Sequence, residues 1–324
     1  MYKQGLIFGK FMPVHAGHLA LIDFAATHCQ HLIVSMSFTP SDPIAPGLRF
    51  AWLQEIFKNR PEVEVVQELD DFHDDSLPLW EATKLWADFI QRRFPAIEVF
   101  FCSETYGEPL SQHLGLPCIY FDKARQQVPV SATQIRANPF DYWAFIPTEV
   151  RPYFVKKICL YGPESTGKST LSEALAQYYN TAFVPEMARK MLTSNDFTID
   201  TIIAIGEAQT QAVISQTCIA NKLLFCDTDL ITTQIYARHY FGEIPAQLVY
   251  LEQQVQYNYY CLLAPDLPWE ADNLRDLGHR REEMFAIFKN ELDIRQLPYQ
   301  VVKGSWHERF EVIKQTVNQL FYSR

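Results

Sequence analysis

Short apolar runs alternate along the chain with longer segments in which apolar residues recur at helical spacing. In the first half, the runs predict strands at 5–8, 32–37, 62–66 and 97–102, and the longer segments predict helices at 19–26, 50–57 and 79–93. Strands that alternate with helices in this way are typical of a parallel sheet covered by helices. The first half is therefore predicted to be a doubly wound α/β domain.

A second series of the same kind follows. Its predicted strands begin at residue 157 and continue at 181–184, 223–226, 260–263 and 299–302. Between the two series, residues 137–155 contain three prolines and show no period, which indicates a packed junction. We expect two doubly wound parallel-sheet domains, at 1–145 and 146–324. The length of 324 residues, at roughly 150 per domain, agrees with that number.

Composition and charge narrow the class of partner. Hydrophobic residues make up 48% of the chain and charged residues 20%, which is enough apolar material for buried cores. Lys and Arg total 28 against 38 Asp and Glu, so the formal net charge is −10. A surface that coats nucleic acid needs clustered positive charge, so we predict no nucleic-acid partner. Nucleotide sites remain compatible with this charge, because backbone amides and a few basic side chains can hold phosphates.

The ends and the cysteines predict a cytoplasmic protein. The chain starts with a strand-like run and shows none of the regions of a signal peptide. No apolar run approaches the roughly 18 residues that a membrane helix needs, so we predict no membrane insertion. The seven cysteines are scattered and form no CxxC pair, which favours reduced, buried thiols over a zinc site.

The first chemical motif is the segment GKFMPVHAGH at residues 9–18, between the first strand and the first helix. A glycine turn that leads into a helix N-terminus is a binding site for anions, because free N–H groups and the helix dipole face the ligand. The rings of His15 and His18 can donate to phosphate oxygens, and Gly17 allows a close approach to the backbone. The alternative is a surface turn with two incidental histidines.

A second segment, VSATQIR at residues 130–136, favours the phosphate site. Ser131 and Thr133 resemble helix N-caps, and Arg136 would face a phosphate tail. The two segments together are similar to the two signatures of the HIGH-type nucleotidyltransferases, which have a Rossmann-like fold. These enzymes transfer the adenylyl group of ATP to a phosphate monoester and release pyrophosphate. The resemblance implies an ATP site at Gly9, Lys10, Phe11, His15, Gly17, His18, Ser131, Thr133 and Arg136.

The same resemblance implies a mechanism. His15, His18, Lys10 and Arg136 would neutralise charge on the triphosphate while the acceptor phosphate attacks the α-phosphorus. Little proton transfer is required, so catalysis would consist of positioning and electrostatic stabilisation. Mg²⁺ would assist without a dedicated protein cage.

The second motif is GPESTGKS at residues 162–169, which matches G-x-x-x-x-G-K-[ST] at every fixed position. It follows an apolar strand and precedes a segment with helical spacing, which is the context of a Walker A loop. Lys168 would reach the β- and γ-phosphates of ATP, and Ser169 would bind Mg²⁺. The candidate contacts with ATP are Gly162, Glu164, Ser165, Thr166, Gly167, Lys168, Ser169 and Thr170.

Charged residues then follow where a P-loop kinase would need them. Glu186 and Arg189 come after a predicted strand and could bind an acceptor hydroxyl, with Glu186 as the general base. Asp227 would orient Mg²⁺, and Asp229 would contact the acceptor. The alternative for each carboxylate is a solvated loop charge. Arg275, Arg280 and Arg281 could form a lid over ATP, or could belong to an ordinary charged helix.

A HIGH-type nucleotidyltransferase followed by a P-loop kinase resembles the bifunctional nicotinamide-mononucleotide adenylyltransferase/ribosylnicotinamide kinase family (NadR type), over essentially all 324 residues. Further similar segments are DTD at 227–229 and PWEADNLR at 268–275. Trp80, which ends DDFHDDSLPLW, stands where the family has an aromatic for the nicotinamide ring; a core role in its helix is the alternative. The implied mononucleotide site also includes Ser103, Glu104, Tyr106 and Gly107. Enteric members carry an N-terminal helix-turn-helix, which this sequence does not contain, so DNA binding is not predicted.

The resemblance implies that the second half phosphorylates nicotinamide riboside with ATP and that the first half adenylylates the mononucleotide to NAD. The implied ligands are ATP, Mg²⁺, nicotinamide riboside, nicotinamide mononucleotide and NAD. A nicotinamide-riboside transporter as partner and a homo-oligomer are expectations at the level of the family. Two alternatives stay open: the same folds acting on another nucleoside or phosphate ester, and a nucleotide-sensing regulator with weak turnover.

Overall fold

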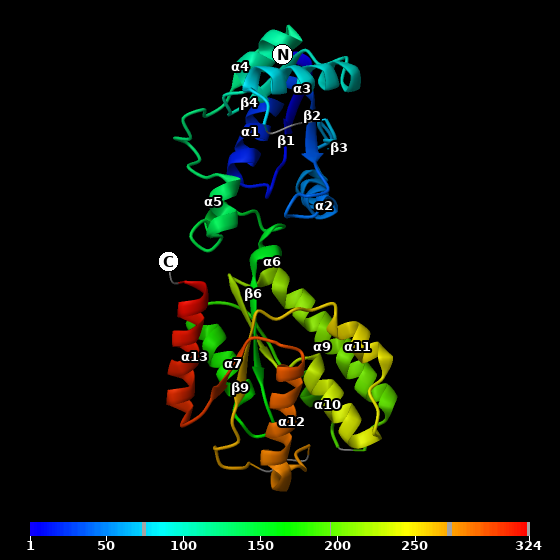
Figure 1. The fold of residues 1–324 in the computed structure, drawn as a ribbon, viewed down its shortest axis with the longest axis vertical. Coiled ribbons are helices and arrows are strands. Elements are labelled where there is room, and N and C mark those ends of the chain that lie inside the picture. Colours follow the sequence, from blue (N-terminus) through cyan, green and yellow to red (C-terminus); the bar gives the residue numbers. More distant parts are fainter. Residues whose placement is uncertain (73–75, 195, 271–273, 323–324) are drawn as a thin grey trace. The chain divides into compact units, whose positions relative to one another are not determined.

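The computed structural model describes residues 1–72, 76–194, 196–270 and 274–322. The segments DDFHDDSLPLW and PWEADNLR therefore lie partly outside the described residues. The chain divides into two compact units, Met1–Arg151 and Pro152–Arg324 (Figure 1). None of the helices in the described ranges is both long and apolar enough to span a bilayer.

The N-terminal unit is built on a five-stranded parallel sheet in the order β3-β2-β1-β4-β5. Its strands are β1 (Tyr2–Gly9), β2 (Cys29–Phe38), β3 (Val63–Leu69), β4 (Val99–Cys102) and β5 (Cys118–Tyr120). Its helices are α1 (Ala16–Ala26), α2 (Pro46–Phe57), α3 (Leu79–Arg93), α4 (Gly107–Leu114) and α5 (Ala132–Ala137), followed by the 3-10 turn η1 (Trp143–Phe145).

Helices cover both faces of this sheet. On one face, α3 and α4 bury Ile90 and Leu110 against Leu6 and Phe100 of the central strands. On the opposite face, α1 packs through Phe24, whose ring meets Phe101 edge to face with centroids 6.3 Å apart. Strands buried on both faces need continuous apolar runs, and β4 (VFFC) is buried at every position.

The C-terminal unit contains a second five-stranded parallel sheet, in the order β10-β9-β6-β8-β7. Its strands are β6 (Lys156–Tyr161), β7 (Phe183–Val184), β8 (Leu223–Asp227), β9 (Tyr259–Leu263) and β10 (Tyr299–Val302). Its helical elements are α7 (Lys168–Tyr178), α8 (Met187–Met191), α9 (Ile199–Ile219), α10 (Leu230–Phe241), α11 (Ala246–Glu252), η2 (Gly278–Arg280), α12 (Arg281–Ile294) and α13 (Trp306–Phe321). The short helix α6 (Arg151–Phe154) leads into β6.

This sheet also has helices on both sides. Ile231 and Phe288, from α10 and α12, pack against Tyr161 and Leu262 of β6 and β9. Figure 1 shows α7 and α13 on the other side of the sheet. The predicted fold class, two doubly wound parallel-sheet domains, is confirmed.

Two differences from the sequence prediction affect the N-terminal site. Strand β5, with three residues, was not predicted, because so short a run carries no periodic signal. Helix α1 begins at Ala16, three residues before the predicted start at 19, because His15 serves as its N-cap. The histidine turn is therefore part of the helix N-terminus itself.

Both sheets have a point where the strand order reverses, and each lies beside a phosphate motif. In the N-terminal unit the reversal falls between β1 and β4, and β1 ends at Gly9. In the C-terminal unit it falls at β6, directly before Gly162. Ligands of open α/β sheets bind outside the carboxyl ends of the strands at such reversals. The topology thus gives one candidate site in each unit.

Candidate active sites

A cavity of about 420 Å³ opens at the carboxyl ends of β1 and β4 in the N-terminal unit. Most of the predicted adenylyltransferase residues line it together: Gly9, Lys10, Phe11, His15, Gly17, His18, Ser103, Glu104, Tyr106, Ser131 and Thr133. Two segments far apart in sequence, the histidine turn and the start of α5, thus meet at one cavity. Ser131 is the N-cap of α5 and accepts a hydrogen bond from the Gln134 N–H at 3.2 Å.

The two histidines are held by the backbone of their own turn. The Nδ1 atom of His15 accepts from the Gly17 N–H at 3.1 Å, and the Nδ1 atom of His18 accepts from the His15 N–H at 3.3 Å. A neutral imidazole that accepts at Nδ1 carries its proton on Nε2, so each ring keeps an Nε2–H donor. Burial lowers the pKa of His15 to about 4 and the pKa of His18 well below its usual value. The histidines therefore supply N–H dipoles, whereas positive charge was expected from them.

Positive charge at this cavity comes from Lys10 and from Arg125, a residue that the sequence reasoning missed. Lys10 Nζ lies 3.6 Å from Asp42, and Arg125 Nη2 lies 2.6 Å from Glu104. Arg136 does not line the cavity: its guanidinium donates to the Met12 carbonyl and, at 3.2 Å, to Thr133 Oγ1. Its contact with the histidine turn is therefore structural. Arg125 stands in the loop that follows β5, and only the prediction of that short strand could have drawn attention to it.

The aromatic assigned to the nicotinamide ring needs a correction. Trp80 is 52% exposed in the first turn of α3 and packs against His113, with ring centroids 4.0 Å apart. It does not line the cavity, whereas Trp86 does. Trp86 lies six residues after Trp80 on the same helix, so the two side chains point in directions about 120° apart around the helix axis. Trp86 packs on Phe8 of β1, with ring centroids 5.3 Å apart.

Gly107, the last residue of the segment SETYG at 103–107, also stays outside the cavity lining. A Cβ atom at this position would lie 2.4 Å from Cys102 Sγ and 2.8 Å from the Tyr120 hydroxyl. Because neither neighbour can retreat in a packed interior, the glycine is required for the close packing of α4 against β4 and β5. The structure therefore gives this glycine a role in packing.

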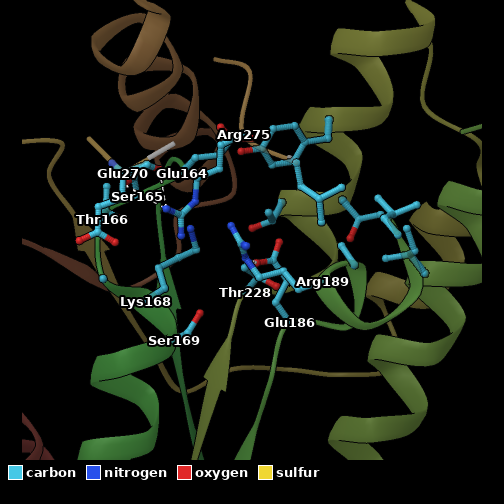
Figure 2. Close-up of a pocket in the computed structure, with 18 of the residues that line it drawn as sticks. Glu164, Ser165, Thr166, Lys168, Ser169, Glu186, Arg189, Thr228, Glu270 and Arg275 are labelled. Carbon is cyan, nitrogen blue, oxygen red and sulfur yellow. Dashed lines mark hydrogen bonds and ion pairs between the residues drawn. The ribbon is translucent and has the colours of Figure 1, made fainter. Parts of the chain in front are cut away.

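A second cavity, of about 380 Å³, lies at the carboxyl ends of the strands in the C-terminal unit. Figure 2 shows Lys168 and Ser169 on one side of it and Glu186 and Arg189 on the other. The predicted residues that line it are Glu164, Ser165, Thr166, Gly167, Lys168, Ser169, Thr170, Glu186, Arg189 and Arg275. The Walker loop and the candidate acceptor residues thus share one cavity.

The Walker loop has the backbone of an anion cradle. Ser165 and Gly167 have φ values of 57° and 85°, in the left-handed region, which turns successive N–H groups toward one side. Gly162 does not line the cavity, but a Cβ atom there would lie 2.8 Å from the Leu263 carbonyl, so the loop can pass this close to β9 only with glycine. The Lys168 ammonium donates to the carbonyls of Gly162 and Pro163 at 3.0 and 2.9 Å, within reach of a bound phosphate.

Ser169 and Asp227 form the candidate magnesium site. The Ser169 hydroxyl donates to Asp227 Oδ2, while Oδ1 is buried and accepts no hydrogen bond from the described residues. Burial and the charge of Glu186 raise the pKa of Asp227 to about 6. Among the residues that the structure describes, no three His, Cys, Asp or Glu gather as a metal cage. The Ser169 hydroxyl and Oδ1 of Asp227 are oxygen ligands, and substrate phosphates would supply further ones. Mg²⁺ prefers oxygen ligands of this kind.

Glu186 and Arg189 form an ion pair across one turn at the start of α8, with Arg189 Nε 3.3 Å from Glu186 Oε2. Buried Gln209 holds this turn: its Oε1 accepts from the Met187 N–H at 2.9 Å, and its Nε2 donates to the Asp227 carbonyl at 3.4 Å. One side chain thus joins the start of α8 to the end of β8. This link brings the turn that carries Glu186 to the end of β8, where Asp227 lies buried without lining the cavity itself.

Asp229 and Arg280 have other roles than those predicted. Asp229 is the buried N-cap of α10, and its oxygens accept from Thr232 and from the Tyr260 hydroxyl, at 2.9 and 3.1 Å. Both of its oxygens are engaged by these groups, and Asp229 does not line the cavity. Arg280 pairs with Glu283 at the surface and does not line the cavity. Arg275 does line it, and donates to the Glu270 carbonyl at 2.6 Å.

Several cavity residues escaped the sequence reasoning. Tyr236 and Tyr240 from α10 and Trp306 from α13 line the cavity, and no motif points to them. Thr228 does so as well, in the left-handed region with a φ of 69°, between the two aspartates that the sequence singled out. Glu164 of the Walker loop lines the same cavity. Burial and the charge of Asp276 raise the pKa of its carboxyl group to about 7.

The chain is similar to known proteins in sequence and in fold. Residues 157–309 match the family described as AAA domain. The chain is 31% identical, over 301 residues, to the trifunctional NAD biosynthesis/regulator protein NadR of Escherichia coli K12, covering 85% of this chain and 72% of that protein. Over 141 residues it is 25% identical to a nicotinamide-nucleotide adenylyltransferase of Thermococcus kodakarensis, covering 42% of this chain and 72% of that enzyme.

Among solved structures, the chain is similar in fold to a NadR protein in complex with NR, with a TM-score of 0.84 and 21% identity over 99% of this chain and 97% of that chain. A NadR protein in complex with NAD and AMP-PNP gives a TM-score of 0.81 and 22% identity over 100% of this chain and 97% of that one.

Proposed function

Because the chain belongs to the family of the NAD biosynthesis/regulator protein NadR, we propose that it makes NAD from nicotinamide riboside in two steps. The C-terminal unit phosphorylates the riboside with ATP, and the N-terminal unit joins the resulting mononucleotide to AMP from a second ATP. The family acts in NAD biosynthesis, with nucleotidyltransferase and kinase activities. The observation that carries the assignment of the first step is the shared cavity of Lys168, Ser169, Glu186 and Arg189.

In the kinase step, the 5′-hydroxyl oxygen of the riboside attacks the γ-phosphorus of ATP. The new O–P bond forms as the bond between the γ-phosphorus and the bridging oxygen breaks, and ADP leaves. Glu186 accepts the hydroxyl proton, and Arg189 holds its carboxylate. Lys168 exchanges its two loop carbonyls for phosphate oxygens. Ser169 and Asp227 would hold Mg²⁺, which would neutralise charge on the phosphates.

In the adenylyl transfer, a phosphate oxygen of the mononucleotide attacks the α-phosphorus of ATP. The bond between the α-phosphorus and the bridging oxygen breaks, and pyrophosphate leaves. No proton must move, so the site acts through orientation and electrostatics. The Nε2–H groups of His15 and His18 and the Lys10 ammonium face the triphosphate, and Trp86 packs against the nicotinamide ring.

The test is an incubation of the intact protein with ATP, Mg²⁺ and a panel of nucleosides, with products followed by mass spectrometry. Formation of NAD from nicotinamide riboside supports the proposal. Turnover of another nucleoside assigns the same chemistry to a different substrate, and tight nucleotide binding without turnover indicates a sensor. A cytoplasmic location, a riboside transporter as partner and a homo-oligomeric state stay predictions of the sequence.

A further inference from the structure

Arg49 and Arg309 are the two largest side chains that are completely buried, one in each unit. Buried guanidinium groups are costly unless several hydrogen bonds satisfy them. Neither arginine lines either of the two cavities described above, and no motif includes either of them. Each nevertheless donates to a backbone carbonyl of the phosphate-binding loop of its own unit.

Arg309, on α13, joins four segments of the C-terminal unit. Its guanidinium donates to the carbonyls of Thr166, Ala264 and Gly304 at 3.1, 3.0 and 2.8 Å, and to the carboxylate of Asp266. Thr166 is the central residue of the Walker loop. The arginine thereby ties the loop to the end of β9 and to the turn before α13.

Arg49, on α2, makes an equivalent connection in the N-terminal unit. It donates to the Lys10 carbonyl, to the Ile44 carbonyl at 3.0 Å and to Asp42 Oδ2 at 2.6 Å. The other oxygen of Asp42 lies 3.6 Å from Lys10 Nζ. Arg49 thus holds the backbone of Lys10 directly and its side chain through Asp42.

The two held carbonyls stand next to strained backbone. Thr166 lies between Ser165 and Gly167, whose φ values are 57° and 85°, and Lys10 precedes Phe11, whose φ is 45°. Residues in the left-handed region persist only where the surroundings fix them. In a planar trans peptide the carbonyl and the following N–H point in opposite directions. A carbonyl held on the outer side of the loop therefore turns the following N–H toward the cavity of its own unit. Gly167 lines the cavity of the C-terminal unit, and Phe11 lines that of the N-terminal unit.

We propose that Arg309 and Arg49 are positioning residues that preset the amide donors of the two phosphate loops for ATP. This inference rests on the proposed function only for the identity of the acceptor substrates. Each arginine acts on the nucleotide site of its own unit and leaves the other unit unchanged. In each variant, the unaltered site of the same polypeptide therefore serves as an internal control.

The variants are Arg309→Lys and Arg49→Lys, since lysine keeps the charge but cannot make the same set of bonds. In Arg309→Lys we expect the KM of the kinase for ATP to rise about tenfold. This factor corresponds to the free energy of one charge-assisted hydrogen bond. Its KM for the riboside and the rate of mononucleotide adenylylation should stay within twofold. Arg49→Lys should raise the KM for ATP of adenylylation alone. The matched control is Arg295→Lys, which removes a multiply bonded arginine of the C-terminal unit that does not touch the loop.

Titration with Mg²⁺ and the analogue AMP-PNP needs no acceptor, so it separates this inference from the proposed function. The difference between wild type and Lys168→Met isolates binding at the Walker loop. If Arg309→Lys does not fold, Asp266→Asn weakens the same anchor from a partly exposed position and should raise KM in the same direction by about threefold. An unchanged affinity for nucleotide in the folded variants overturns the inference, as does an equal rise in Arg295→Lys.

Discussion

The imidazole rings of His15 and His18 stack with their centroids 3.8 Å apart and an interplanar angle of 30°. Two positive charges at this distance repel each other strongly, and the neighbouring Arg125 adds to the repulsion. Burial disfavours the charged form of both rings for the same reason. The N-terminal unit is therefore stable with two neutral histidines at its phosphate site.

The stability of the N-terminal unit should consequently fall on mild acidification. An unfolded histidine titrates near pH 6.5, whereas the pKa of His15 in the folded unit is about 4. Between these values the unfolded chain binds more protons, so the stability present above pH 6.5 is lost as the pH decreases toward 4. From pH 6.5 to 5, His15 alone should remove about 2 kcal/mol from the free energy of unfolding.

This loss is measured by unfolding the protein in urea at a series of pH values. Pulsed hydrogen exchange, with every pulse at one fixed pH, then reports the unfolded fraction in peptides from α1. The control is His15→Asn, because asparagine also serves as an N-cap but does not titrate. The variant should show a clearly flatter dependence between pH 5 and 6.5. The same slope in variant and wild type would exclude His15 as its source.

The two activities should be separable by single substitutions. Lys168→Met removes the ammonium that lies within the Walker loop, so phosphorylation of nicotinamide riboside should be abolished while NAD still forms from the mononucleotide. His18→Ala should have the opposite effect. Both reactions are measured in each folded variant with purified substrates. Loss of both reactions in either variant would contradict the assignment of one site to each unit.

The fold and the phosphate loops were predictable because their signals are local. Apolar runs alternate with helical spacing throughout, and this alternation gave both parallel sheets. The Walker loop and the histidine turn are continuous segments whose fixed residues are required by the backbone geometry. Strand β5 has too few residues for any period, and so the adjoining Arg125 was missed with it.

The remaining site residues depend on helix phase and on tertiary contacts. Trp80 and Trp86 share one helix, and only the packing of α3 on Phe8 decides which indole reaches the cavity. Asp227 and Asp229 stand two residues apart at a strand end, and the start of α10 makes the second a cap. Arg49 and Arg309 look like ordinary surface arginines in the sequence, because their burial arises from contacts with distant loops.

Trp86, and not Trp80, should determine affinity for the mononucleotide. An indole over a cationic pyridinium ring contributes roughly 1–2 kcal/mol when desolvated. Trp86→Ala should therefore raise the KM for nicotinamide mononucleotide about tenfold, with the KM for ATP nearly unchanged. Steady-state kinetics of NAD formation measures both constants. Trp80→Ala is the matched control, since it removes an exposed indole from the same helix and should leave both constants unchanged. The opposite pattern would return the role to Trp80.

Glu186 should be the general base of the kinase. It lines the cavity opposite Lys168, Arg189 holds its carboxylate at 3.3 Å, and Gln209 fixes the turn that carries it. Glu186→Gln keeps the size and the hydrogen bonding of the side chain but removes its ability to accept a proton. General-base assistance is typically worth 10²–10⁴-fold, so the kinase kcat should fall by about that factor.

Two measurements separate a missing base from a disturbed site in Glu186→Gln. The affinity for Mg²⁺ and AMP-PNP should remain that of the wild type, because Lys168, Ser169 and Asp227 are intact. The rate of mononucleotide adenylylation should also be unchanged, because it occurs in the other unit. Glu207→Gln, which removes an exposed carboxylate from α9, should have no effect on the kinase. Near-normal kinase turnover in Glu186→Gln would contradict the assignment and transfer the role to Asp227, the candidate carboxylate at the end of β8.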